Sequence, residues 1–186
     1  MLPEHLGGHN NVTNLDTGVL DWVIDRYSIK SFLDLGCGPG GMVEYAHSLG
    51  LKSIGIDGDY TLERPDNSRY ILHDFTTGPL HIEEKFGLGW TTEFVEHVEE
   101  KYIPNYMPVL SACKYMVMTY APPGHGGHHH VNENTQEYWI ETLAEWGFVF
   151  HEHETNSIRE YTTMHNGRKN KNFMKLRGMF FENKNF

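Results

Sequence analysis

Short apolar runs alternate with amphipathic segments along most of the chain. The runs cover residues 32–35, 53–57, 70–75, 88–94 and 115–120. Each is short for a helix, and glycine, proline or acidic residues lie at or close to its end. Short apolar runs bounded in this way are typical of strands that are buried on both faces. The pattern therefore predicts five strands of a largely parallel sheet.

The segments between these runs predict helices. Residues 19–27 and 135–146 place apolar side chains at helical spacing, and Asn134 or Thr135 is expected to cap the second of these helices. Residues 41–49 and 98–106 occupy the equivalent places after the first and fourth strands. Alternation of this kind predicts one α/β domain over residues 1–186.

The last part of the chain predicts an antiparallel pair of strands. Residues 148–153 and residues 177–181 form this pair, and the segment between them is rich in basic side chains. We expect that segment to be a solvated loop, with contact to an anionic substrate as the alternative. The basic residues are Arg168, Lys169, Lys171, Lys175 and Arg177.

Composition limits the partners. A chain of 186 residues suits one core and is short for separate cofactor and substrate domains. Its apolar runs are too short to cross a membrane, and Cys37 and Cys113 are isolated thiols, so we expect a cytoplasmic protein. The formal net charge of −10 argues against a nucleic-acid partner.

Residues 36–41 form a glycine-rich turn directly after the first predicted strand. Glycines at these positions let the backbone turn sharply and let a ligand lie against the main chain. The following helix offers free N–H groups at its start. Both Gly36-x-Gly38-x-x-Gly41 and Gly36-x-Gly38-x-Gly40 are present, so the glycines alone leave open a dinucleotide, S-adenosylmethionine or a turn without a ligand.

Asp34, two residues before the first glycine, favours S-adenosylmethionine. A carboxylate repels the pyrophosphate of a dinucleotide, whereas S-adenosylmethionine carries an ammonium and a sulfonium and no phosphate. Asp57 and Asp74 lie at the ends of the next two strands. Asp57 could accept hydrogen bonds from ribose hydroxyls, and Asp74 could receive an adenine amino group beside Phe75.

With these residues the chain resembles the class I S-adenosylmethionine-dependent methyltransferases. The resemblance implies a single Rossmann-like domain with helices on both faces of a mostly parallel, seven-stranded sheet whose last strand is reversed. It also implies a methionine site at the glycine turn, a ribose site at the second acid and an adenine site at the third. The expected cofactor-binding residues are Asp34, Gly36, Cys37, Gly38, Gly40, Asp57, Gly58, Asp74, Phe75 and Glu93.

A second group of chemically active residues is Glu93-x-x-Glu96-His97 together with the later His130. It resembles the metal-binding set of the small-RNA 3′-terminal 2′-O-methyltransferases and of the ubiquinone-pathway catechol O-methyltransferases. The resemblance implies that these four residues bind Mg²⁺ or another divalent metal. The alternative is that Glu93 contacts the methionine end of the cofactor while the other two residues of the segment orient a helix.

The leading hypothesis is therefore an O-methyltransferase that acts on a small hydroxylated acceptor with help from a divalent metal. The catalytic candidates are His97, His129 and His130, because histidine transfers protons near neutral pH. Two alternatives stay open: a metal-independent enzyme that methylates an N atom or a nucleic-acid end, and a subunit that binds the cofactor without turnover. Residues 1–18 are expected to form a lid, with a poorly ordered N-terminus as the alternative.

Overall fold

The computed structural model describes residues 2–9, 11–164 and 172–186, which form one seven-stranded sheet. The strand order is β3-β2-β1-β4-β5-β7-β6; β7 runs antiparallel to both β5 and β6, and the other pairs are parallel. This confirms the expected sheet with a reversed last strand. The strands are β1 (Ser31–Leu35), β2 (Lys52–Asp57), β3 (Tyr70–Leu72), β4 (Phe86–Thr91), β5 (Cys113–Met118), β6 (Phe148–Phe150) and β7 (Met179–Asn183).

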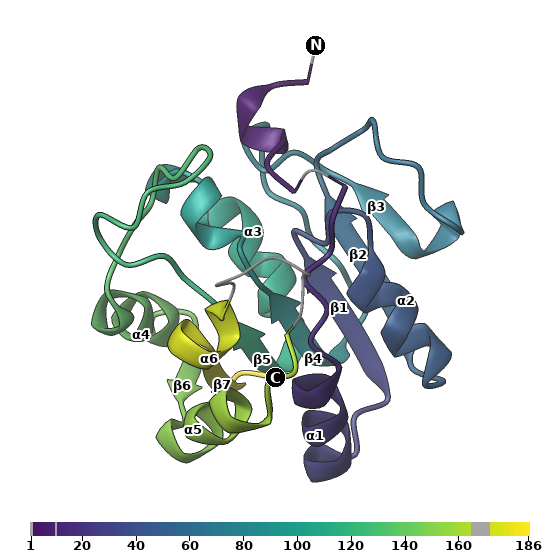
Figure 1. The fold of residues 1–186 in the computed structure, drawn as a ribbon, viewed down its shortest axis with the longest axis vertical. Coiled ribbons are helices and arrows are strands. Elements are labelled where there is room, and N and C mark those ends of the chain that lie inside the picture. The colour runs from purple at the N-terminus through teal and green to yellow at the C-terminus, as the bar shows by residue number, and fades with distance from the viewer. Residues whose placement is uncertain (1, 10, 165–171) are drawn as a thin grey trace.

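Helices cover both faces of the sheet, as expected (Figure 1). Side chains of α1, α2, α5 and α6 belong to the core on one face, and those of α3 and α4 belong to the core on the other. None of the helices formed by the described residues is long and apolar enough to span a bilayer. The helices are α1 (Thr17–Tyr27), α2 (Gly41–Ser48), α3 (Ile103–Leu110), α4 (Gln136–Ala144), α5 (Glu152–Tyr161) and α6 (Phe173–Arg177).

Local sequence signals account for several element boundaries. Asp16 caps α1 by accepting a hydrogen bond from the Val19 N–H, and Thr135 caps α4 in the same way, as one of the two predicted caps. Apolar side chains alternate between the two faces of β1, so that Phe32 packs on the α1–α2 side and Leu33 on the α3 side. This two-sided burial explains why the strand is apolar almost throughout.

Three predicted boundaries were wrong. Residues 148–153 do not form one strand, because β6 ends at Phe150 and α5 begins at Glu152. The segment before β7 is not a simple loop either, since α5 and α6 pack Ile158, Phe173 and Met174 into the core. The helix expected at 98–106 begins later, at Ile103, where Pro104 occupies the first turn and needs no hydrogen-bond partner for its nitrogen.

The predicted strands also end earlier than expected. β3 stops at Leu72 and β4 stops at Thr91, so Asp74, Phe75, Glu93 and Phe94 lie in the loops that follow. β1 pairs with β2 on one side and with β4 on the other, which makes this the point where the strand order reverses. In open parallel sheets the loops beyond such a point enclose a crevice. The fold therefore brings the candidate residues to one edge of the sheet.

The central strand should dominate the stability of this fold. We expect Leu33→Ala to lower the free energy of unfolding by about 2–5 kcal/mol, because Leu33 is fully buried between two layers and its loss leaves a cavity. Leu49→Ala, at a residue that is 44% exposed, should change it by less than about 0.5 kcal/mol. Urea unfolding of both variants measures the difference, and equal midpoints would contradict the prediction.

Candidate functional site

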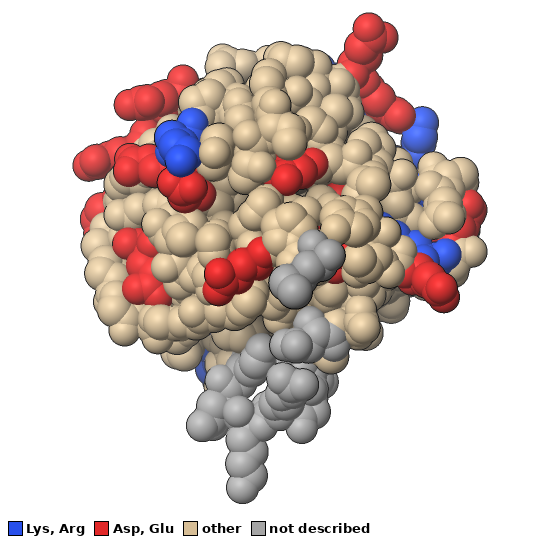
Figure 2. All heavy atoms as spheres, turned by 90° about the horizontal axis from the view of Figure 1, so that it is seen from above, with Lys and Arg blue, Asp and Glu red and all other residues tan. Residues whose placement is uncertain are grey.

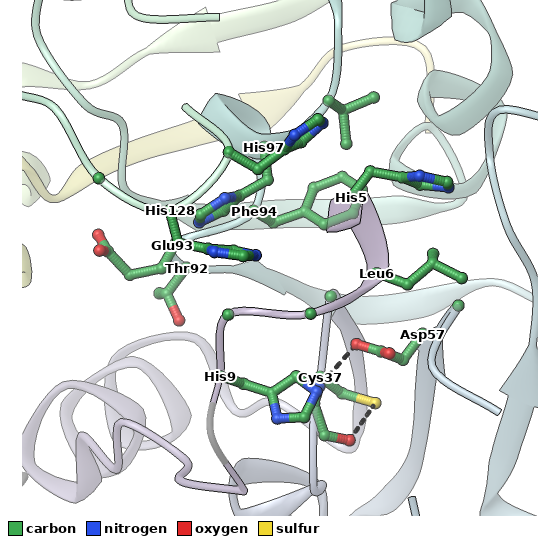
Figure 3. A pocket seen from close by; sticks show the side chains of 18 of the residues that line it. His5, Leu6, His9, Cys37, Asp57, Thr92, Glu93, Phe94, His97 and His128 are labelled. Atoms are coloured by element: carbon green, nitrogen blue, oxygen red, sulfur yellow. Dashed lines mark hydrogen bonds between the residues drawn. The ribbon is translucent and has the colours of Figure 1, made fainter. Parts of the chain in front are cut away.

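A cavity of about 610 Å³ opens at the carboxyl ends of the central strands. The glycine turn after β1, the ends of β2 and β3, the loop after β4 and the histidine-rich loop after β5 all line it. The N-terminal segment lines it too (Figure 3). Of the fourteen candidate site residues from the sequence, twelve line this cavity. Gly40 and Glu96 do not line it, and Glu96 is fully buried.

The glycine turn has the sharp backbone turn that the sequence predicted. Gly36 and Gly40 have φ angles of +77° and +88°, in the left-handed region that favours glycine. A Cβ at Gly36 would lie 2.5 Å from the Phe94 ring, and one at Gly40 would lie 2.2 Å from the Tyr70 hydroxyl. Glycine is therefore required at both positions, by conformation and by space.

Asp57 links the turn to the end of β2. Its Oδ2 accepts a hydrogen bond of 2.8 Å from the Gly38 N–H, and its Oδ1 accepts one of 2.8 Å from the Asp59 N–H. Arg64 donates to the Gly38 carbonyl through Nε and Nη2 at 3.1 and 2.9 Å, and its Nη2 lies 3.8 Å from Asp57 Oδ1. Arg64 fixes this corner of the pocket, and no sequence motif pointed to it.

Asp34 is a buried acid that faces the cavity. Burial and the neighbouring Asp57 carboxylate raise the pKa of Asp34 well above its usual range. No described residue donates a hydrogen bond to its side chain, so nothing in this part of the chain compensates its negative charge. A cationic ligand would compensate the charge of the ionised Asp34 carboxylate.

Asp74 and Phe75 lie together beyond β3. Thr76 donates to Asp74 Oδ1 through its N–H and its hydroxyl, at 2.9 and 2.8 Å, and His5 Nε2 lies 3.0 Å from Asp74 Oδ2. Burial raises the pKa of Asp74, but the bonds from His5 and Thr76 outweigh it and leave the pKa below its usual range. Phe75 is buried and meets the Phe94 ring edge-on at 6.0 Å.

The N-terminal segment crosses the pocket, between the side that carries Asp57 and the side that carries His97 (Figure 3). Leu6 packs against Gly58, where an added Cβ would lie 2.4 Å from the leucine methyl. His9 Nε2 lies 2.9 Å from Asp59 Oδ2. Apart from the expectation of a lid, sequence reasoning missed His5 and Leu6, because no spacing rule pairs the start of a chain with distant strand ends.

Glu93 adopts a φ of +54°, which is uncommon for a residue with a side chain. The Thr119 hydroxyl holds it there by accepting from the Glu93 N–H at 2.9 Å and lying 3.2 Å from Oε1. Arg177 Nη2 is 4.0 Å from the same Oε1. Strained backbone of this kind is concentrated at functional sites, because surrounding contacts must maintain it.

The structure brings three of the four proposed metal ligands together. One possible ligand atom each from Glu96, His97 and His130 lies within 4.8 Å of the other two, and Glu93 is not in this group. The Glu96 carbonyl accepts hydrogen bonds from the Val131 and Asn132 N–H groups, at 2.9 and 3.2 Å. These backbone bonds attach the histidine-rich loop to the short helix Val95–His97, which is why residues far apart in sequence meet.

The donor set fits a divalent cation. Glu96 is fully buried, and neither of its carboxylate oxygens has a hydrogen-bond partner among the described residues. Burial and the nearby Glu93 carboxylate raise the pKa of Glu96 well above its usual range. Burial and the His130 ring lower the pKa of His97 to about 4, so His97 is neutral at physiological pH. A metal binds a neutral imidazole and an ionised carboxylate, so a bound cation would favour the ionised form of Glu96 that burial disfavours.

The remaining candidates are placed as follows. His129 lines the cavity with a φ of +49°, and its ring centroid is 6.2 Å from that of His5. Arg168, Lys169 and Lys171 lie outside the described residues. The expectation of a solvated basic segment was wrong for Arg177, which ends α6, is 8% exposed, and lies 3.0–3.1 Å from the His125 ring nitrogens.

Several solved structures with a similar fold are methyltransferases. The methyltransferase domain of bacterial CtHen1 aligns with a TM-score of 0.56 at 15% sequence identity, over 88% of this chain and 94% of that one. Magnesium protoporphyrin IX methyltransferase (ChlM) from Synechocystis with bound SAM aligns with a TM-score of 0.55 at 14% identity, over 88% and 74%.

A TehB-like SAM-dependent methyltransferase from Corynebacterium glutamicum aligns with a TM-score of 0.58 at 17% identity, over 89% of this chain and 85% of that one. No protein-family model and no curated protein sequence matches the chain. At identities this low the structural likeness establishes the fold alone. The chain has the fold of the S-adenosylmethionine-dependent methyltransferases, and its activity must be argued from its own site.

The buried Glu96 should make the metal-free protein less stable at high pH. Because folding raises its pKa, Glu96 contributes stability at low pH that is lost as the pH rises through the raised value. In a chelating buffer we expect Glu96→Gln to be more stable than the wild type at pH 8 by about 1–3 kcal/mol, with a smaller gap at pH 5.

Urea unfolding at both pH values measures this gap, and Glu141→Gln, at an exposed position on α4, serves as the matched control. The control should follow the wild type at each pH. A Glu96→Gln variant that is less stable than the wild type at pH 8 would show that the carboxylate is compensated in the folded protein.

Proposed function

We propose that the protein is an S-adenosylmethionine-dependent methyltransferase that acts on the hydroxyl oxygen of a small acceptor. The observation that carries this proposal is the placement of Asp34, Asp57 and Asp74 around one cavity, beside a glycine turn. A cavity with this acidic lining suits a cofactor that bears an ammonium and a sulfonium, and it does not suit a pyrophosphate. The fold of the methyltransferases supports the same conclusion.

Each acid would bind a different part of the cofactor. Asp34 would pair with the ammonium of the methionine part, which would restore its ionised form. Asp57 would accept from the ribose hydroxyls, and Asp74 would accept from the adenine amino group while Phe75 packs against the base. His5 now bonds Asp74, so adenine would have to share or displace that bond. Because the N-terminal segment lines the same cavity and contacts Asp74, we propose residues 1–18 as a lid over the cofactor.

The rest of the cavity suits a neutral or cationic acceptor. Phe94, Val98 and Tyr102 supply an apolar wall next to the histidines, and no lysine or arginine is among the described residues that line the cavity. Acidic side chains are spread over the face seen in Figure 2, which carries few basic ones. With a formal net charge of −10, this favours a small molecule over a nucleic acid.

Methyl transfer requires the acceptor oxygen, the methyl carbon and the sulfur to lie in line. The oxygen forms a bond to the methyl carbon, the bond between that carbon and sulfur breaks, and the hydroxyl proton leaves. If no metal is bound, His129 or His130 would accept this proton as general base. Glu96, His97 and His130 would hold a divalent cation, which would supply Lewis acidity that lowers the pKa of the acceptor hydroxyl. Glu93 would hold the methionine end of the cofactor.

Cofactor binding tests the proposal directly. We expect S-adenosylhomocysteine to bind the wild type, and Asp57→Ala to weaken binding about 10- to 100-fold, because hydrogen bonds to a charged group contribute about 1.5–3 kcal/mol. Isothermal titration calorimetry measures both affinities. Asp25→Ala, at an exposed position on α1, is the control and should bind like the wild type. Equal affinities of Asp57→Ala and the wild type would contradict the ribose role.

Turnover tests the reaction and the metal separately. With a panel of small phenols, catechols and alcohols, we expect methyl transfer that a chelator abolishes and that Mg²⁺ or Mn²⁺ restores, and we expect Glu96→Ala to be inactive. Full activity in chelator with an unchanged rate for Glu96→Ala would exclude the metal and leave the methyltransferase. Cofactor binding without turnover on any acceptor, amines and nucleic-acid ends included, would instead indicate a non-catalytic binding protein.

A further inference from the structure

Glu133 makes three hydrogen bonds within the histidine-rich loop, and it does not line the cavity. Its Oε2 accepts from the Gly124 N–H at 2.8 Å, and its Oε1 accepts from the Gly126 N–H at 2.6 Å. The same Oε1 lies 3.0 Å from His130 Nδ1. One carboxylate thus bonds two backbone N–H groups and one imidazole ring.

These bonds determine which nitrogen of His130 is protonated. A carboxylate that already accepts two amide N–H groups is ionised and can only accept, so His130 Nδ1 must carry a proton to bond with it. In the neutral ring the lone pair is then on Nε2. This nitrogen is left free to bind a cation or to accept a proton.

The loop backbone allows the ring to stay in this position. A Cβ at Gly127 would lie 2.4 Å from His130 Nε2, so the backbone passes directly under that nitrogen. His97 meets the His130 ring edge-on, with centroids 4.9 Å apart, and His125 stacks on it at 5.9 Å. The ring is therefore held by a carboxylate at one nitrogen and by two neighbouring imidazoles.

We propose that Glu133 is a positioning residue that holds His130 in the Nδ1–H tautomer, with Nε2 available at the site shared with Glu96 and His97. This inference deepens the proposed function, because it rests on a role for His130 in that site. A carboxylate behind a histidine ligand or base fixes the ring orientation and increases its basicity, and removing such a partner typically weakens metal binding or activity about 10- to 100-fold.

The tautomer can be read without metal, cofactor or acceptor. Long-range ¹H–¹⁵N correlation spectra of the metal-free protein distinguish the two neutral forms, and the His130→Gln spectrum assigns the signals. We expect the Nδ1–H form of His130 in the wild type and a shift toward the Nε2–H form in Glu133→Ala. Glu137→Ala, four residues further on at an exposed position, should leave the tautomer unchanged.

Glu133→Gln keeps the size of the side chain and serves if the alanine variant does not fold. Its neutral amide is a weaker acceptor, so the same shift should appear with smaller amplitude. An Nε2–H form in the wild type, or an unchanged tautomer in a folded variant, would overturn the proposal. Glu133 would then only stabilise the loop through its bonds to the Gly124 and Gly126 N–H groups. Neither outcome bears on cofactor binding, so this failure is distinct from failure of the proposed function.

Binding of Mn²⁺ alone supplies a second measurement. We expect calorimetry to show an affinity about 10- to 100-fold lower for Glu133→Ala than for the wild type, with Glu137→Ala unchanged. Equal affinities of the two variants would contradict a positioning role toward the metal. If the wild type binds no Mn²⁺, the metal hypothesis fails and the tautomer measurement still decides the role of Glu133.

Discussion

Two buried acids, Asp34 and Glu96, set the constraint on which this pocket depends. Asp34 lines the cavity, Glu96 lies outside its lining, and burial raises the pKa of both. Ionised carboxylates are held in a protein interior only when a cation or hydrogen-bond donors compensate them. On the proposed function, the ammonium of a bound cofactor would compensate Asp34, and a bound metal would compensate Glu96.

The surrounding structure keeps the two ends separate. At the Asp34 end, the glycine turn, Asp57 and Arg64 form a rigid corner that brings main-chain groups against the cavity. At the Glu96 end, the backbone carbonyl of Glu96 accepts hydrogen bonds from the Val131 and Asn132 N–H groups of the histidine-rich loop. Side chains hold the glycine turn at the first end, whereas backbone hydrogen bonds attach the loop at the second.

Acids and histidines also meet in pairs around the cavity mouth. His5 bonds Asp74, His9 bonds Asp59, and His130 bonds Glu133. The first two pairs attach the N-terminal segment to the ends of the strands, while the third lies inside one loop. On the proposed function, a cofactor would compete with the first pair and leave the third intact.

The sequence by itself determined the type of fold and one half of the site. Apolar runs ending near acids and glycines indicate parallel strands, and Asp34, Asp57 and Asp74 meet because parallel strands end at one edge of a sheet. Helices α5 and α6 were missed because their apolar residues are few and the chain around them is basic or polar. Local pattern is weak evidence where packing decides the outcome.

Only the tertiary structure decided the other half of the site. It placed Glu96, His97 and His130 together and left Glu93 with Thr119 and Arg177, although all four follow one sequence motif. It brought His5, Leu6 and Arg64 to the cofactor side and gave Glu133 its place behind His130. These contacts join segments far apart in the chain or depend on the path of a loop, and neither follows from spacing along the sequence.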